Sequence, residues 1–394
     1  MALRNLKIYG PSVKMPLHVK SGIPGVKKLL HIGIHNSLNR NAGDTLLFTV
    51  VRKVFDTVLG PFDWELKQVW EEFTLEAGNH KSNYADGIVL GGGGLLLRDQ
   101  DGSDISNSGW QWNSSVEVVD AINVPFVIFS IGYNQFRGQN NFEPIFKKHV
   151  CSLTEKVGFF GLRNSGSIRA LSKHLSPERA TTLRRQFCPT NVLWQLYPKY
   201  QAMAKNHDKQ KEKVLVLNTA FDRDNLRFGD SKNDLLARLA GAIRNAQIRG
   251  WQIVVVAHKT KDREIETHLN AMDVTYDTVD ITDARPEEIM EFYARVDFVI
   301  GMRGHSQMIP FGLRRPIFSI ISHDKMSYFL EDISKPEWGV EIDRTDLGQQ
   351  IETALMKIES DRETIHAEIK NIQSFIWQET CDNLSYIGQK IFGF

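Results

Sequence analysis

Short apolar runs alternate with longer amphipathic segments along most of the chain. The apolar runs, rich in Val, Ile and Leu, lie at residues 27–34, 84–90, 125–131, 157–161, 214–217, 251–257, 296–300 and 316–321. Such runs are typical of parallel strands that are buried on both faces. Residues 45–59 instead carry apolar side chains at i, i+3 and i+4 spacing, which predicts a helix with one buried face. The alternation therefore predicts a parallel α/β fold.

The length of 394 residues and one polar interruption suggest how the fold is divided. Residues 202–213 are charged and lack apolar periodicity, so we interpret them as a linker between two α/β domains. We expect an N-terminal domain at 1–200, a C-terminal domain at 214–340, and helices at 341–394 that close the two domains. The predicted fold class is α/β, with two Rossmann-like domains in a GT-B-like arrangement and C-terminal helices.

Composition excludes several function classes. The 48 basic residues nearly balance the 47 acidic ones, which argues against a general nucleic-acid binder. The three cysteines form no CxxC pair, so neither a disulfide framework nor a structural zinc site is indicated. The sequence shows no signal peptide and no apolar stretch of membrane-spanning length. We therefore expect a soluble, cytoplasmic protein.

The stretch 296–321 is the clearest candidate for a functional site. It predicts a strand, a tight turn at 302–306, a short helix and a second strand, which together form a right-handed βαβ unit. Such units bind ligands beyond the carboxyl end of the first strand, where backbone N–H groups and the helix dipole favour anions. Arg303 and His305 in this turn suit an anion. The alternative is structural: Arg303 pairs with a neighbouring carboxylate, and His305 caps the helix.

Two turns in the first half carry weaker signals. Asp44 stands at the start of the helix predicted over 45–59, either as its N-cap or as a carboxylate placed to accept a hydroxyl proton. Four glycines at 91–94 follow an apolar run, and they suit either the approach of a ligand or close packing of the backbone. Beyond them, Trp110 and Trp112 lie in a polar loop at 98–113. This pair suits either stacking on sugar rings or anchoring of the loop.

Five blocks together resemble the polysaccharide pyruvyltransferase family. They are NRNAGD at 39–44, GGGGL at 91–95, SIGYN at 130–134, LRNSGS at 162–167 and the long block at 296–320. The resemblance implies transfer of a pyruvyl group from phosphoenolpyruvate to two hydroxyls of a sugar, which forms a cyclic ketal. The acceptors implied are glycans or lipid-linked glycan precursors of the cell envelope or of exopolysaccharide.

The sequence departs from the family pattern at three positions. Gly304 replaces a leucine between the arginine and the histidine of the turn at 302–306, which we call the focal turn. Asn164 replaces an aspartate, and Cys188 replaces the aspartate of an Asp-Pro pair. The last two changes remove carboxylates, so a role for those groups is in doubt.

The chemistry and the resemblance together suggest residue roles. The donor carries a phosphate and a carboxylate, which arginine can bind bidentately. Histidine titrates near neutrality and can act as an acid. We expect the C-terminal domain on the donor side and the N-terminal domain on the acceptor side. The candidates are His305 and Asp44 for catalysis, Arg303, Arg163, Lys325 and Ser306 for the donor, and Asn39, Gly43, Gly92, Gly93 and Asn134 for the acceptor.

No metal or cofactor is expected, because phosphoenolpyruvate is itself the donor substrate. The partners expected are this donor, a sugar or lipid-linked oligosaccharide, and the inner face of the membrane that carries the acceptor, with no nucleic acid. Two alternatives stay open. One is a GT-B glycosyltransferase that uses a nucleotide sugar, whose diphosphate Arg303 and the helix N-terminus would hold. The other is a non-catalytic relative that binds glycans.

Overall fold

The computed structural model describes residues 18–34, 41–74, 86–99, 103–208 and 213–393. They form two compact units. The N unit comprises the described residues of 18–34, 47–189 and 377–393, and the C unit comprises those of 41–46 and 190–376. The chain thus passes between the units more than once, in contrast to a succession of domains that meet near residue 200.

In the described part of the N unit, a seven-stranded sheet has the order β1-β3-β2-β4-β5-β6-β7. Its strands are β1 (His18–Val19), β2 (Lys28–Gly33), β3 (Asp63–Gln68), β4 (Ile88–Leu96), β5 (Phe126–Tyr133), β6 (Phe159–Leu162) and β7 (Leu183–Arg185). Only the β1–β3 pair is antiparallel. The helices are α1 (Ala42–Leu59, whose first turn belongs to the C unit), α3 (Val116–Ala121), α4 (Pro144–Lys156), α5 (Ser165–Ser172) and α6 (Pro177–Ala180).

The described part of the C unit holds a six-stranded parallel sheet, ordered β10-β9-β8-β11-β12-β13. Its strands are β8 (Lys213–Asn218), β9 (Trp251–Ala257), β10 (Tyr276–Asp280), β11 (Phe298–Gly301), β12 (Ile317–Ile321) and β13 (Gly339–Glu341). Its α-helices are α7 (Leu193–Leu196), α8 (Pro198–His207), α9 (Asp224–Phe228), α10 (Lys232–Ile248), α11 (Glu266–Ala271), α12 (Pro286–Ala294), α13 (Gly304–Gly312), α14 (Asp324–Asp332), α15 (Leu347–Ser360) and α16 (Arg362–Tyr386, whose residues from Trp377 on belong to the N unit). Shorter 3-10 turns are η1 (Pro189–Val192), η2 (Gly229–Ser231), η3 (Thr260–Ile265) and η4 (Pro336–Trp338). The π-helical turn η5 (Ile387–Phe392) follows α16 and belongs to the N unit.

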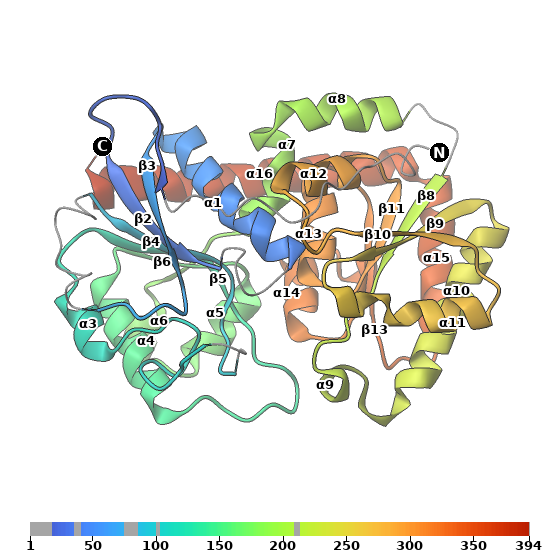
Figure 1. Ribbon diagram of the computed structural model, residues 1–394, viewed down its shortest axis with the longest axis horizontal. Helices are drawn as coiled ribbons and strands as arrows, with labels where there is room; N and C mark the ends of the chain where they lie inside the picture. The colour runs from blue at the N-terminus through green and yellow to red at the C-terminus, as the bar shows by residue number, and fades with distance from the viewer. Residues whose placement is uncertain (1–17, 35–40, 75–85, 100–102, 209–212, 394) are drawn as a thin grey trace. The chain divides into compact units, whose positions relative to one another are not determined.

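Both units are layered as a parallel α/β fold predicts. In the C unit, α10, α11 and α15 lie on one face of the sheet and α12, α13 and α14 on the other (Figure 1). The central strands β5, β11 and β12 are buried along their whole length, as their apolar runs predicted. The prediction of two Rossmann-like α/β domains with C-terminal helices is confirmed.

Each sheet reverses its strand order once, beside its first parallel strand in the sequence. In the C unit the chain proceeds from β8 to β9 and β10 on one side, and then returns to place β11 on the other side of β8. In the N unit the same reversal separates β3 from β4 on either side of β2. Open α/β sheets bind ligands at such switch points, beyond the carboxyl ends of the strands. The fold therefore directs attention to the loops after β2, β4, β8 and β11.

The glycine run does not end its strand, contrary to the prediction. Strand β4 continues through all four glycines to Leu96, and its pairing with β5 shifts register between Gly93 and Leu96. Gly92 and Gly93 have φ angles of 81° and 105°, which glycine adopts without strain. Glycine thus makes an irregular strand possible here rather than a loop.

The structure decides between the two alternatives for the tryptophans and corrects the linker prediction. Trp110 and Trp112 are 0% exposed and belong to the apolar core of the N unit, so they anchor their loop and cannot stack on a sugar. The linker prediction at 202–213 is wrong in its first half, because α8 extends to His207. Residues 209–212 lie outside the described part of the chain. Polar composition alone did not distinguish an exposed helix from a linker.

Candidate active site

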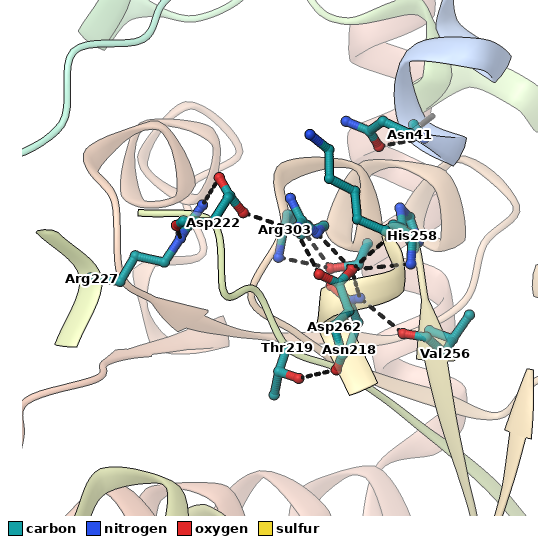
Figure 2. A network of polar contacts seen from close by, with 12 residues as sticks. Asn41, Asn218, Thr219, Asp222, Arg227, Val256, His258, Asp262 and Arg303 are labelled. Atoms are coloured by element: carbon teal, nitrogen blue, oxygen red, sulfur yellow. Dashed lines mark hydrogen bonds and ion pairs between the residues drawn. The ribbon is translucent and has the colours of Figure 1, made fainter. Parts of the chain in front are cut away.

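Charged side chains gather at the carboxyl edge of the C unit's sheet. The loops that follow β8, β9 and β11 supply Asp222, Asp262 and Arg303 (Figure 2), and Lys325 follows β12. Asn218 at the end of β8 pairs with Gly301 at the end of β11, so these two loops start side by side. The cluster thus occupies the switch point of the sheet.

Arg303 is held by two carboxylates, as the structural alternative predicted. Its Nε donates to Oδ2 of Asp262 over 2.7 Å, and its Nη2 donates to Oδ1 of the same carboxylate over 2.5 Å. Nη2 also lies 2.9 Å from Oδ1 of Asp222. Burial alone would lower the pKa of Arg303, but the two carboxylates outweigh it and raise that pKa above its usual value. Nη1 forms no hydrogen bond within the described part of the chain, so one edge of the guanidinium remains for another acceptor.

Asp262 is fully buried, and fixed donors surround its carboxylate. Oδ2 accepts hydrogen bonds from the backbone N–H groups of His258 and Lys259, each over 3.1 Å. It also accepts one from Nδ2 of Asn218 over 3.3 Å. Since these donors belong to the ends of β8 and β9, Asp262 is immobile and fixes the orientation of Arg303.

Asp222 bridges two arginines. Its Oδ2 accepts from Nη2 of Arg227 over 3.0 Å, while its Oδ1 faces Arg303. Burial opposes ionisation of Asp222, yet the positive charges of Arg303, Arg227 and Lys325 outweigh burial and hold its pKa well below the usual range. Asp222 therefore remains a carboxylate at any physiological pH.

His305 packs directly against the first turn of α1. A Cβ placed on Gly43 would stand 2.6 Å from Cβ and Cγ of His305 and would also overlap its Nδ1. Only glycine leaves room for the imidazole at this contact. The backbone N of Ala42, one residue earlier, donates to the carbonyl O of His258 over 3.3 Å. The structure thus brings together Gly43 and His305, which come from sequence blocks more than 250 residues apart.

Asn41, rather than Asp44, caps helix α1. Its Oδ1 accepts from the backbone N of Gly43 over 3.1 Å, and its Nδ2 donates to Oδ2 of Asp44 over 2.8 Å. The N-cap interpretation of Asp44 was therefore wrong by three positions. Asp44 lies in the first turn of α1, where the helix dipole favours a carboxylate. Its carboxylate belongs to the same turn that packs on His305.

His258 adds a buried neutral imidazole to the cluster. Its Nε2 lies 2.6 Å from the hydroxyl O of Tyr293, and both side chains are fully buried. Burial, followed by the positive charges of Arg303 and His305, lowers the pKa of His258 well below its usual value. Burial also raises the pKa of Tyr293 well above its usual value. Neither group carries a charge at neutral pH.

Ser306 closes the focal turn, and Lys325 lies beside it. The Oγ of Ser306 accepts from the backbone N of Arg303 over 3.1 Å and donates to its carbonyl O over 2.8 Å. Its hydroxyl is thus committed to the start of α13, and His305 does not cap that helix. The Cε of Lys325 would lie 3.9 Å from a Cβ placed on Gly304. That a donor contacts Ser306 or Lys325 stays a prediction.

Arg163 lies in the N unit, after β6. Its guanidinium covers Gly132 so closely that a Cβ there would stand 2.5 Å from Cζ of Arg163. The next residue, Asn164, caps α5 by accepting from the backbone N of Ser167 over 2.7 Å. Asparagine caps a helix about as well as aspartate. The exchange of the family's aspartate for Asn164 therefore preserves the cap and removes only the charge.

The acceptor candidates of the N unit show mainly packing roles. A Cβ on Gly92 would stand 3.0 Å from Cγ of Leu47 and from Cγ2 of Val51, so α1 covers this glycine. The Nδ2 of Asn134 donates to the carbonyl O of Gly94 over 3.3 Å. Acceptor contacts of Gly92, Gly93 and Asn134 stay predictions, and Asn39 lies outside the described residues.

The comparison with family models decides which family this fold and site represent. A model of the polysaccharide pyruvyl transferase family matches residues 22–324, which is most of the chain. The chain belongs to the polysaccharide pyruvyl transferase family. Membership places it among the transferases of polysaccharide biosynthesis. A comparison with curated proteins gave no match.

Solved structures with a similar fold include three proteins whose structures contain UDP or UDP-glucose. MnaA of S. aureus bound to UDP is 12% identical to this chain. The match covers 92% of this chain and 97% of MnaA, with a TM-score of 0.53. HepE of Anabaena in complex with UDP and glucose is 10% identical, and the match covers 93% of this chain and 100% of HepE, with a TM-score of 0.53. UGT71G1 of Medicago truncatula complexed with UDP-glucose is 10% identical, and the match covers 93% of this chain and 99% of UGT71G1, with a TM-score of 0.51. At these identities the likeness shows the fold alone.

The described residues contain neither a metal-binding cluster nor a membrane-spanning helix. No three His, Cys, Asp or Glu side chains among them gather closely enough to hold a metal ion. No helix among them is both long and apolar enough to cross a membrane. The absence of a metal from the reaction stays a prediction.

The partners of Arg303 were not found from the sequence. Asp262 and His258 follow β9, and Asp222 and Arg227 follow β8, both at carboxyl ends of predicted strands. The position of these residues after apolar runs was a usable signal. What the sequence lacked was the strand order, which alone places the β8 and β9 loops beside β11.

Proposed function

We propose that this family member transfers the pyruvyl group of phosphoenolpyruvate to two hydroxyls of one sugar, forming a cyclic ketal. The acceptor would be a sugar of a glycan or of a lipid-linked glycan precursor in the synthesis of cell-envelope polysaccharide or exopolysaccharide. The observation that carries the proposal is the geometry of Arg303. This arginine is oriented by buried Asp262 at the switch point of the sheet, with Arg227 and Lys325 nearby. Family membership supports a pyruvyl donor as the anionic ligand.

The donor's charges match the groups at this edge. A phosphate and a carboxylate need fixed cations and N–H donors. Arg303 offers Nη1, and α13 begins at Gly304 with its N–H groups directed toward the same loops. Since Asp262 already orients Arg303, little side-chain entropy is lost when the donor binds.

In the proposed reaction, the methylene carbon of the donor gains a proton while a sugar hydroxyl attacks the adjacent carbon and gives up its own. The bond from that carbon to the phosphate oxygen then breaks, and phosphate leaves with the electron pair. A second hydroxyl attacks the same carbon and loses its proton, which closes the ketal. His305 would supply the first proton or stabilise the departing phosphate, and Asp44 would accept a hydroxyl proton.

A glycosyltransferase that uses a nucleotide sugar is the second candidate. The observation that favours it is the fold shared with proteins bound to UDP or UDP-glucose. Their identities of 10–12% support a common fold, whereas the family match spans most of the chain. We therefore favour the pyruvyl donor. We also propose that the protein works beside the membrane that carries its acceptor.

Product analysis tests the proposal. The protein is incubated with phosphoenolpyruvate and a panel of free and lipid-linked oligosaccharides, and the products are examined by mass spectrometry and by phosphate release. We expect equimolar phosphate and a glycan that carries a pyruvate ketal. Asp44→Asn should release phosphate about two to four orders of magnitude more slowly, the usual range for an acid–base group. Helix α1 keeps its cap in this variant, because Asn41 provides it. Glycan products that gain a sugar from UDP-glucose, with no reaction of phosphoenolpyruvate, would establish the second candidate.

A further inference from the structure

Asp222 is held by its two arginines as a bound oxyanion would be held. One of its carboxylate oxygens lies 2.9 Å from Nη2 of Arg303, and the other lies 3.0 Å from Nη2 of Arg227. Lys325 adds a third positive charge that acts on the same carboxylate. A phosphate or a carboxylate of a ligand presents two oxygens in the same way.

Both arginines are fixed by groups other than the Asp222 carboxylate. Asp262 holds Arg303 through Nε and Nη2. The hydroxyl of Ser322 accepts from Nη1 of Arg227 over 2.7 Å, and the backbone carbonyl of Asp222 accepts from its Nε over 2.8 Å. The two cations would therefore stay in place if the Asp222 carboxylate turned away.

The two carboxylates differ in their freedom to move. The side chain of Asp262 is 0% exposed, whereas that of Asp222 is 34% exposed. The backbone before Asp222 is anchored, because Phe221 is buried and its ring stacks on Phe228 at 5.7 Å between centroids. A change of rotamer thus suffices to carry the Asp222 carboxylate into solvent, without movement of the loop.

Arg227 lacks full compensation where it lies. Burial, assisted by the nearby charge of Arg303, lowers its pKa below the usual value despite the opposing effect of Asp222. An incoming oxyanion with more negative charge than one carboxylate would compensate it better. Phosphate meets this requirement at neutral pH.

We propose that Asp222 is an exchangeable internal counter-ion: it occupies the place of the donor's oxyanion between Arg303 and Arg227, and leaves when the donor binds. The proposal rests on the proposed function for the identity of the donor, and it adds Arg227 as a donor-binding residue. Exchange of one anion for another keeps both buried arginines paired in the empty and in the occupied site. The empty site therefore keeps a counter-charge beside both buried arginines.

Binding measurements on three variants test the exchange. Calorimetric titrations with phosphoenolpyruvate and with inorganic phosphate compare wild type with Asp222→Asn, Asp222→Ala and Asp224→Asn. Asp224 is the matched control, since its side chain is 33% exposed and it pairs with Lys232 outside the cluster. We expect both Asp222 variants to bind roughly two- to tenfold more tightly, as loss of one partly exposed competing ion pair implies. The control should bind like wild type.

The outcomes separate the exchange from the function. Tighter phosphate binding in both Asp222 variants, together with no binding of phosphoenolpyruvate, would keep the exchange and reject the pyruvyl donor. Unchanged or weaker binding of both anions in the Asp222 variants would overturn the exchange, because Asp222 would then be a structural partner like Asp262. Absence of binding of either anion to every variant would overturn it too.

Discussion

The switch points of the two sheets differ in chemistry although their topology is the same. In the C unit, the loops after β8 and β11 carry Asp222, Arg227 and Arg303, a network of buried ions. In the N unit, the strand beside the switch point is β4, whose glycines pack against neighbouring backbone and helix. A Cβ on Gly33 of β2 would stand 2.9 Å from the carbonyl O of Gly91. Charged side chains thus surround the switch point of the C unit, whereas closely packed glycine backbone lies in the described part of the N unit's switch point.

We infer that topology sets the place where a ligand binds, whereas the residues at that place select the ligand. A charged edge with oriented arginines suits a small, highly charged donor. In the described part of the N unit's switch point, the buried glycines at 91–93 add no side-chain charge, and we propose that neutral hydroxyls of a sugar bind on this side. This contrast supports the proposed assignment of the donor to the C unit and of the acceptor to the N unit, and substitutions in each unit test that assignment.

Removal of the central cation of the C unit should have the largest effect. Arg303→Met leaves the carboxylate of Asp262 fully buried without its bidentate partner. Breaking a buried ion pair on one side costs about 3–5 kcal/mol. Urea unfolding at pH 7 should report this loss, and Arg303→Met combined with Asp262→Asn should recover part of it. Equal stability of wild type and Arg303→Met would mean that the ion network contributes no stability.

His305→Gln should separate binding from chemistry at the same edge. Glutamine keeps a polar side chain of similar reach but cannot titrate, so donor affinity should change little. Turnover should fall by about two to four orders of magnitude, the usual range for an acid–base group. Donor titrations and single-turnover phosphate release provide the two measurements. A variant that binds poorly yet reacts normally at saturating donor would make His305 a binding group.

Acidification should destabilise the N unit through His149, which lies in the core rather than at a switch point. Burial lowers the pKa of His149 to about 4, and its Nδ1 accepts from Nε1 of Trp110 over 3.0 Å. The unfolded chain binds this proton near the ordinary value of about 6.5, so stability is lost as pH falls from there toward the folded value. The loss should amount to about 3 kcal/mol. Melting temperatures from pH 7 to 4 should fall less steeply in His149→Gln, which keeps an acceptor for Trp110, and identical slopes would refute this account.

Substitutions of Gly43 in the C unit and of Gly92 in the N unit compare the two switch points. Gly43→Ala should displace His305 and reduce turnover at least about tenfold, a loss of roughly 1.4 kcal/mol of transition-state stabilisation. Alanine is otherwise the better helix former by about 1 kcal/mol. Gly92→Ala, at a φ of 81° and against Leu47, should lower stability by about 1–3 kcal/mol and leave donor affinity unchanged. If Gly92→Ala weakened donor binding instead, the division of roles between the edges would fail.

The sequence predicted local features well and distant pairings poorly. The focal turn was found because strand, turn and helix follow one another within 296–312, and the structure has β11 and α13 there. The partner of Arg303 lies 41 residues earlier in the sequence and reaches it only through the order of the strands. The same holds for Gly43 and His305, whose contact no periodicity encodes.

The errors have physical causes of the same kind. Glycines were expected to end β4, but neighbouring strands and α1 hold them within the sheet. Residues 202–207 were expected to belong to a linker, but α8 extends to His207, whose side chain is buried. Tertiary packing overrode local propensity in both cases.

Ligand-induced stabilisation tests whether the protein binds phosphoenolpyruvate as its donor. Thermal unfolding of the wild-type protein is followed with phosphoenolpyruvate or with UDP-glucose, in the presence of a chelator that removes divalent metals. A ligand at a hundredfold excess over its dissociation constant stabilises the folded state by about 2.7 kcal/mol. We expect phosphoenolpyruvate to raise the melting temperature and UDP-glucose to leave it unchanged. A rise with UDP-glucose and none with phosphoenolpyruvate would contradict this expectation.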